Sequence, residues 1–240
     1  MDLHKISMNC TRTEFVGTAV LDTIGLVIPS VNNALLKTMH LPEDRIYPTL
    51  GLLTSRTGAA GQITAVDEAL KATNSHLVSI ELPRDTKGWG GHGNYIIIGG
   101  DDVSDVRRAI EIALKLTNKF AGELYISEAG HLEFAYSANA GKVLQEFFNA
   151  KPNEAFGFMA GSPAAIGLVM ADTAMKSAQS DIISYMTPDK GTSHSNEVIL
   201  ALSGTASAVK RSVIEARQIG LELLIAMGSY PNVPGTSYIG

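Results

Sequence analysis

The sequence predicts an α+β protein built from two tandem copies of one antiparallel-sheet domain. Three observations lead to this prediction. The chain of 240 residues repeats itself at an offset of about 105 residues, and hydrophobic residues make up 45% of it, enough for a sizeable core. Within each copy, strand-like segments follow one another directly as well as alternating with helical ones.

The repeat fixes the domain organisation. AVDEALKATNSHLVS, residues 65 to 79, aligns with MADTAMKSAQSDIIS, residues 170 to 184. The match extends upstream, where VIPSVNNA aligns with FAYSANAG, and downstream, where VSDVRRAIEIA aligns with ASAVKRSVIEA. Domains of about 100 residues are common. We therefore predict an N-terminal segment over 1–13, a first domain over 14–120, a second domain over 121–228 and a C-terminal tail over 229–240.

Local patterns predict the elements of the first copy in order. Residues 14–20 and 23–28 are rich in Val, Ile and Thr, which indicates a hairpin, and Ser30 is expected to cap a helix over VNNALLKTM. The copy continues with a strand over 49–54, a helix around TAVDEALKAT, strands over 76–82 and 95–100, and a helix from Val103. A direct strand-loop-strand step favours an antiparallel sheet with helices on one face.

Charge and composition exclude several classes of protein. The net charge is -5, and no basic run is longer than Arg107 and Arg108, so we expect no nucleic-acid partner. Cys10 is the only cysteine, which excludes an internal disulfide framework and fits a reducing cytosol. The start of the chain lacks a signal-peptide pattern, and Asp22 interrupts its longest early apolar stretch. We expect a cytoplasmic protein with no membrane partner.

The run GWGGHG, residues 88 to 93, has the G-x-G-x-x-G spacing of a nucleotide-binding loop. A dinucleotide site needs a helix after this loop, because the helix N-terminus holds the pyrophosphate, but here the strand YIIIGG follows. The lysine, H-R-D and D-F-G partners of a kinase loop are missing as well. The counterpart loop TPDKGTSHSN, residues 187 to 196, has lost three of the four glycines. We therefore interpret both loops as polar connections and expect no cofactor.

Other candidate chemistry is sparse. The six histidines show no zinc-ligand spacing, so we expect no metal; a ring of His92 or His194 side chains from several subunits is the weaker alternative. Glu128 and His131 lie close together in SEAGHLEF, which we interpret as a solvated turn. Since no convergent nucleophile or acid-base pair is visible, we expect that the protein is not an enzyme.

The repeated motif carries a resemblance to a known family. DEALKAT and DTAMKSA, each followed by a strand, a polar loop, a strand and a helix start such as GDDVSDVRRA, resemble the D-A-x-x-K-A-A motif of bacterial microcompartment (BMC) shell domains. Each copy begins with the hairpin and helix that the ordinary shell domain places last, so the chain resembles the tandem, circularly permuted subclass. TEFVGTAVLDTIGLVI, VSIELPRDTKG, SPAAIGLVMADTA and GTSHSNEVI are similar to propanediol-utilisation shell proteins. The resemblance covers nearly the whole chain from Glu14 onward.

The resemblance implies two BMC domains, ferredoxin-like in style, in a homotrimer that forms a flat pseudohexamer. Such trimers tile with other microcompartment shell proteins around encapsulated enzymes, and full-length members carry an N-terminal extension for cargo. Here about a dozen residues precede the first domain. The implied function is a structural shell protein with gated pores that conduct small polar metabolites such as 1,2-propanediol or glycerol.

The resemblance also implies three groups of site residues. The central pore loops comprise Lys87, Gly88, Trp89, Gly90, Gly91, His92 and Gly93 from the first copy and Lys190, Gly191, Thr192, Ser193 and His194 from the second. A smaller channel within the subunit is expected near Ser55, Arg56, Gly58, Gln62 and Ser162. The motif lysines Lys71 and Lys176 are expected at tile edges. We hypothesise that Trp89 plugs the closed central pore.

One alternative from another class remains open on the sequence. A trimeric small-molecule sensor with duplicated α+β domains would bind a ligand in solution without forming sheets. An enzyme with a site between the two domains is disfavoured, because no convergent catalytic groups are visible.

Overall fold

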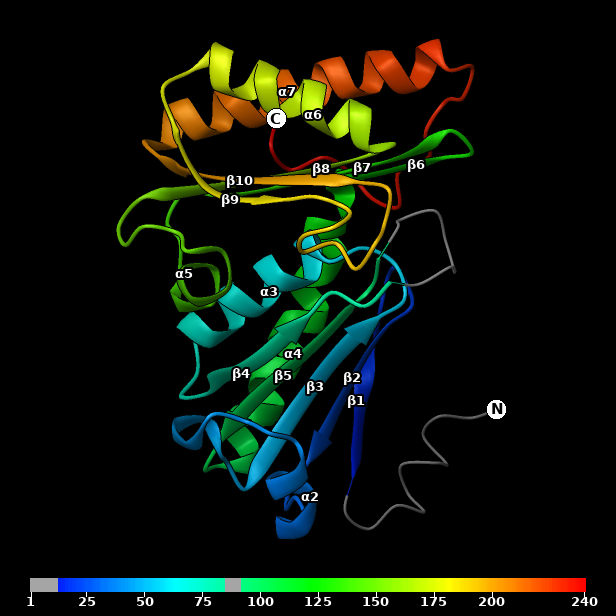
Figure 1. Ribbon diagram of the computed structural model, residues 1–240. Helices are drawn as coiled ribbons and strands as arrows, with labels where there is room; N and C mark the ends of the chain where they lie inside the picture. The colour runs from blue at the N-terminus through cyan, green and yellow to red at the C-terminus, as the bar shows by residue number, and fades with distance from the viewer. Residues whose placement is uncertain (1–12, 85–91) are drawn as a thin grey trace.

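The computed structural model describes residues 13–84 and 92–240, which form two five-stranded antiparallel sheets (Figure 1). The first sheet has the strand order β1-β2-β3-β5-β4, and the second has the order β6-β7-β8-β10-β9. The second order is the first with every strand number raised by five, so the two sheets have the same topology. The repeat that the sequence predicts is therefore a repeat of the fold.

The elements of the first copy agree closely with the predicted ones. They are β1 (Glu14–Ala19), β2 (Thr23–Ile28), α2 (Asn33–Thr38), the 3-10 turn η1 (Glu43–Arg45), β3 (Thr49–Ser55), α3 (Ala60–Lys71), β4 (His76–Glu81), β5 (Asn94–Gly100) and α4 (Val103–Phe120).

The predicted cap of α2 is wrong. Asn32 rather than Ser30 caps this helix, because its side-chain oxygen accepts hydrogen bonds from the backbone nitrogens of Ala34 at 2.9 Å and Leu35 at 3.4 Å. Both residue types are good caps, and the two candidates stand only two positions apart, so composition alone does not separate them.

The second copy repeats this order. It contains the turn η2 (Ala121–Glu123), β6 (Leu124–Ser127), β7 (Gly130–Ser137), α5 (Lys142–Phe148), β8 (Ala155–Ser162), α6 (Ala164–Ser177), β9 (Asp181–Met186), β10 (Val198–Gly204) and α7 (Ala206–Ala226). The tail after α7 returns to the domain, where the carboxylate of Glu123 accepts hydrogen bonds from the backbone nitrogens of Tyr238 and Ile239.

Helices cover both faces of the first sheet, so the prediction of helices on one face is wrong. Leu53 lies opposite Ile96 on the face that packs with α4, whereas Leu52 lies opposite Ile97 on the face that packs with Leu36 of α2. Strands that are buried on both faces read as continuous apolar runs, as LGLL and YIII do here. Such runs do not reveal how many layers cover the sheet.

One hydrophobic core cluster extends across the junction between the two domains. In Figure 1, α6 and α7 cover the outer face of the second sheet, while α3 and α5 lie side by side between the two sheets. The shared core joins Ile63 and Leu77 of the first domain to Val143, Leu144 and Phe148 of the second. The junction between the domains is therefore packed like a domain interior. None of the helices in the described ranges is long and apolar enough to cross a membrane.

Candidate functional site: the domain junction and the paired loops

Asp67 of α3 caps α5 across the domain junction. Its carboxylate is buried and accepts hydrogen bonds from the backbone nitrogens of Gly141 at 2.9 Å and Leu144 at 3.3 Å. Gly141 has no side chain with which to cap its own helix, and a Cβ there would lie 2.5 Å from the Asp67 carboxylate. The motif aspartate thus replaces a local cap, and its negative charge also suits the helix N-terminus.

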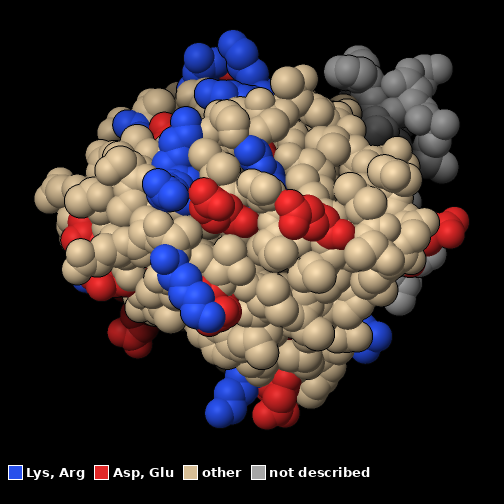
Figure 2. All heavy atoms as spheres, turned by 90° about the horizontal axis from the view of Figure 1, so that it is seen from above, with Lys and Arg blue, Asp and Glu red and all other residues tan. Residues whose placement is uncertain are grey.

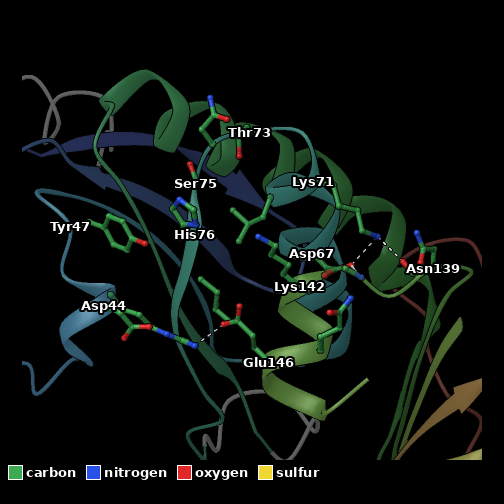
Figure 3. A pocket seen from close by; sticks show the side chains of 16 residues that line it. Asp44, Tyr47, Asp67, Lys71, Thr73, Ser75, His76, Asn139, Lys142 and Glu146 are labelled. Carbon is green, nitrogen blue, oxygen red and sulfur yellow. Dashed lines mark hydrogen bonds and ion pairs between the residues drawn. The ribbon is translucent and has the colours of Figure 1, made fainter. Parts of the chain in front are cut away.

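Lys71 bridges the two domains beside this cap (Figure 3). Its ammonium lies 3.0 Å from Asp67 and 2.6 Å from Glu68, and it donates to the backbone oxygen of Asn139 at 2.8 Å. Partial burial opposes the charge of Lys71, but the hydrogen bonds to the two carboxylates outweigh it and raise the pKa of the lysine. The side chain keeps 32% exposure, so it also faces solvent.

A pocket of about 650 Å³ opens next to Lys71, between the β4 edge of the first domain and α5. Arg45 and Glu146 form an ion pair of 2.8 Å across it, and the rings of Tyr47 and His76 stack with centroids 5.4 Å apart. The lining carries both charge signs. It suits polar side chains of a neighbouring protein better than an apolar ligand.

The second motif lysine has a different environment. Among the residues that the structure describes, Lys176 pairs only with Asp172, at 2.6 Å, within its own helix, and its side chain is 75% exposed. The two lysines that align in the sequence therefore differ in what they contact.

The two loops that are expected to line the central pore have ends that lie next to each other. The described residues do not include Lys87, Gly88, Trp89, Gly90 and Gly91 of the first loop. The hypothesis that Trp89 plugs the pore therefore stays a prediction. In the second loop, Lys190, Gly191, Ser193 and His194 are exposed, and Thr192 is buried. The hydroxyl of Ser193 donates to the backbone oxygen of Leu82, at the start of the first loop, over 3.0 Å.

A buried ion cluster joins the ends of both loops. Nδ1 of His92 lies 2.6 Å from one oxygen of Glu197, and Nε2 of His131 lies 3.0 Å from the other. Burial would raise the pKa of Glu197, but the charge of His92 and the hydrogen bonds from both imidazoles outweigh it and lower this pKa to about 2. Burial likewise disfavours charge on His92, yet Glu197 and Glu133 raise the pKa of its imidazole.

These contacts revise two sequence interpretations. His131 is 1% exposed, so the interpretation of SEAGHLEF as a solvated turn is wrong for this residue. His92 is also 1% exposed, and its ring therefore does not face the surface in this conformation. No local pattern could have found the cluster, because Glu197 is 66 residues from His131 and 105 residues from His92.

A buried polar network surrounds the residues expected at the subunit channel. The amide nitrogens of Gln62 and Asn94 lie 3.2 Å and 2.7 Å from the Ser55 hydroxyl, and Asn94 also donates to the backbone oxygen of Gly58. Arg56 is exposed, and Ser162 is half-buried opposite His131 in the sheet.

The network continues into the second domain. Glu133 accepts hydrogen bonds from the backbone nitrogens of Ala59 and Ala60, and its other oxygen lies 3.8 Å from Nε2 of His92. Within the described ranges, four buried atoms of this region lack a hydrogen-bond partner: Gln62 Oε1, Asn94 Oδ1, His92 Nε2 and Glu133 Oε2. Unpaired buried polar atoms are the kind of group that small polar molecules satisfy. Among the residues that the structure describes, no group of three His, Cys, Asp or Glu side chains is placed to hold a metal ion.

Comparison with known proteins agrees with this geometry. The BMC domain model matches residues 49–129 and 155–233. The bacterial microcompartment shell protein PduB of Citrobacter freundii is 52% identical over 231 residues, which cover 96% of this chain and 85% of that protein. PduB of Limosilactobacillus reuteri is 45% identical, covering 97% and 98%.

Solved structures extend the comparison. A trimeric bacterial microcompartment shell protein PduB has a TM-score of 0.89 at 44% identity, covering 93% of this chain and 98% of that one. EtuB from Clostridium kluyveri has a TM-score of 0.89 at 45% identity, with 95% and 100% covered. The chain therefore belongs to the bacterial microcompartment shell proteins, a structural rather than an enzymatic family, and carries two BMC domains.

Proposed function

We propose that this chain forms homotrimers in the microcompartment shell and that its two polar loops line a central passage for small polar molecules such as 1,2-propanediol or glycerol. The trimeric state of a similar shell protein supports the assembly. The observation that carries the passage is the pairing of the two loop ends, through His92 with Glu197 and through Ser193 with Leu82. Three copies around an axis would thus present six neighbouring loops.

The exposed groups of the second loop suit a neutral diol. Pore selectivity follows from the opening and from the hydrogen-bonding groups that line it. Ser193, His194 and Lys190 offer a hydroxyl, an imidazole and an ammonium group, all exposed. A neutral diol can donate hydrogen bonds to such groups and accept them, and its passage does not incur the free-energy cost of burying a charge.

The test is diol entry into assembled shells. Shells that contain this chain as their tandem component are loaded with a diol-consuming enzyme, and the rate of diol consumption is measured. His194→Trp should slow consumption, because its larger ring narrows the passage, whereas Glu128→Trp, on an exposed turn, should not. Equal rates for the two variants, with equal incorporation into shells, would contradict the proposal.

We also propose roles for the other predicted residues. Lys71 and Lys176 belong to tile edges, where contacts with other shell proteins form; the partly exposed ammonium of Lys71 beside a mixed-charge pocket supports this role. Ser55, Gly58 and Gln62 line a channel within the subunit, supported by the unpaired polar atoms of that region. Encapsulated enzymes are further proposed partners.

A further inference from the structure

The contact between the second loop (187–196) and the first domain is loosely packed. A cavity of about 420 Å³ lies between them. Its lining consists of Ile80, Glu81, Leu82 and Pro83 from the first domain, Phe147 from α5, and Met186, Gly191 and Ser193 at the second loop. Segments with few buried apolar contacts open locally at a low free-energy cost. The position of this loop therefore depends on its polar contacts.

Two such contacts join the loop to the first domain. Near its middle, the hydroxyl of Ser193 donates to the backbone oxygen of Leu82 over 3.0 Å. At its end, an oxygen of Glu197 lies 2.6 Å from Nδ1 of His92. The first contact is between neutral groups, whereas the second contains ionisable groups on both sides and is therefore the one that a change of pH can alter.

The loop is also held by its own domain. The hydroxyl of Thr192 lies 3.1 Å from the backbone oxygens of both Thr187 and Ser195, inside the loop. At the end of the loop, the side-chain oxygen of Asn196 accepts a hydrogen bond from the backbone nitrogen of Ala164 at 3.1 Å. The loop can therefore move away from the first domain and still keep its internal structure and its connection to α6.

The backbone of the loop is strained in the observed position. Ser193 and His194 have φ angles of 52° and 63°, in the left-handed region that side chains other than glycine rarely adopt. Such residues persist where surrounding contacts hold them, and they are common in segments that switch between conformations.

The charges at the end of the loop are buried, unlike most charges of the protein. Figure 2 shows Lys and Arg interspersed with Asp and Glu over α6 and α7, where water and salt screen them. The side chains of His92, His131, Glu133 and Glu197 are instead buried together. Of these four, His92 alone comes from the first domain, so its imidazole supplies the charge that links this cluster across the junction.

Only a doubly protonated imidazole can pair with both carboxylates that face His92. Nδ1 faces Glu197 at 2.6 Å, and Nε2 faces Glu133 at 3.8 Å. A neutral imidazole has one N–H and one lone pair, so either tautomer turns a lone pair toward a buried carboxylate oxygen. Glu197 keeps a partner in its own domain, because Nε2 of His131 lies 3.0 Å from its other oxygen. Loss of a proton therefore weakens the link between the domains in particular.

Other titratable groups near this pair face solvent. On the described parts of the neighbouring segments, the side chains of Arg56, Glu81, Arg84, Asp189, Lys190 and His194 are exposed. Arg84 forms a β-bridge with His92 through the backbone. Exposed charges are screened by salt, so the buried carboxylates dominate the electrostatics of the imidazole.

We infer that His92 and Glu197 form a proton-dependent switch for the position of the second loop. While the imidazole carries both protons, the loop stays against the first domain. When one proton leaves, the loop separates from the first domain and remains attached to its own. The switch lies within one chain and goes beyond the proposed passage, because the contact forms and breaks whether or not the loop lines a pore.

The direction of the pH dependence follows from the two states of His92. Burial disfavours its charge, but Glu197 and Glu133 outweigh burial and raise the pKa of the imidazole above the ordinary 6.5. The contact is therefore complete below pH 6.5 and is lost as the pH rises through the raised pKa. Between these two values, the equilibrium between contact and separation changes up to about tenfold per pH unit. Glu197 stays ionised throughout, since its pKa is about 2.

Distances between two spin labels test the switch. In a Cys10→Ser background, Glu81→Cys and Lys190→Cys place one label on each side of the cavity, at exposed positions. An excess of unlabelled chain restricts the measured distances to pairs within one chain. We expect a short distance at pH 6 and a growing population of longer distances up to pH 9.5. An unchanged distribution, in protein that stays folded by circular dichroism, would overturn the inference.

A pair of histidine variants identifies the titrating group. His92→Gln should give the longer distance at every pH, because glutamine carries no charge to pair with Glu197. His40→Gln is the matched control at an exposed histidine of the first domain and should keep the transition of the unmodified chain. A transition that persists in His92→Gln would overturn the role of this residue. Neither result depends on diol entry, so the switch and the proposed passage can fail independently.

Discussion

Helices α3 and α6 carry the same motif at the same place in their domains, yet their surroundings differ. Residues 61–67 of α3 are all buried, whereas α6 exposes Leu168, Val169 and Asp172. Both helices pack on an equivalent long helix, α4 for α3 and α7 for α6, but α3 also contacts α5 and β7 of the other domain, whereas α6 contacts β8 and β10 of its own sheet. The difference arises from what lies outside the domain: α3 has a second domain against it and α6 does not. The environment of a repeated motif therefore depends on the neighbour.

The largest expected effect comes from breaking the buried cluster of His92, His131 and Glu197 at the junction between the two domains. Glu197→Ala leaves two buried histidines without their carboxylate partner, and a broken buried ion pair costs about 4 kcal/mol. Urea unfolding followed by circular dichroism measures this loss. Glu222→Ala, at an exposed position on α7, is the control and should change the free energy of unfolding little. A small loss for Glu197→Ala would mean that the cluster does not stabilise the junction.

The next effect is the pH dependence of the same cluster. The folded-state pKa of Glu197 is about 2 against an ordinary 4.5, so its contribution of about 3 kcal/mol is present above pH 4.5 and is lost as the pH falls toward 2. The pKa of His92 is raised, so its contribution is complete below its ordinary value of 6.5 and is lost as the pH rises through the higher folded-state pKa.

Urea midpoints measured from pH 2 to 9 check both slopes. In Glu197→Gln the acid-side slope should flatten, because the titrating carboxyl is gone. An unchanged acid-side slope in that variant would assign acid unfolding to other carboxylates.

A smaller effect sharpens the comparison of the two motifs. Asp67→Ala removes hydrogen bonds to two backbone nitrogens and the contact with Lys71, which should cost about 2 kcal/mol. Asp172→Ala removes only an exposed pair with Lys176 and should cost less than about 0.5 kcal/mol. Both changes are measured by urea unfolding followed by circular dichroism. Equal losses in the free energy of unfolding would mean that the two aspartates contribute equally to stability.

The sequence predicted the repeat, the element order and the family, because these follow from local patterns and from the aligned motifs. It did not predict Asn32 as the cap of α2 or the second covered face of the sheet, because composition does not separate these alternatives. The cluster of His92, His131 and Glu197 was beyond sequence reasoning, since these residues are far apart in the sequence and His92 reaches Glu197 only when the two domains dock. The roles of the loops, of the channel residues and of the two lysines stay predictions.

The two ways of capping a helix have a consequence for synthesis of the chain. Helix α2 carries its own cap in Asn32, so its capping needs no residue of the second domain. Helix α5 receives its cap from Asp67 and completes only after the domains meet. The first domain is synthesised first. The apolar groups of its α3 stay uncovered until the segment around Leu144 has been translated. During that interval the nascent chain is most exposed to aggregation and most in need of chaperones.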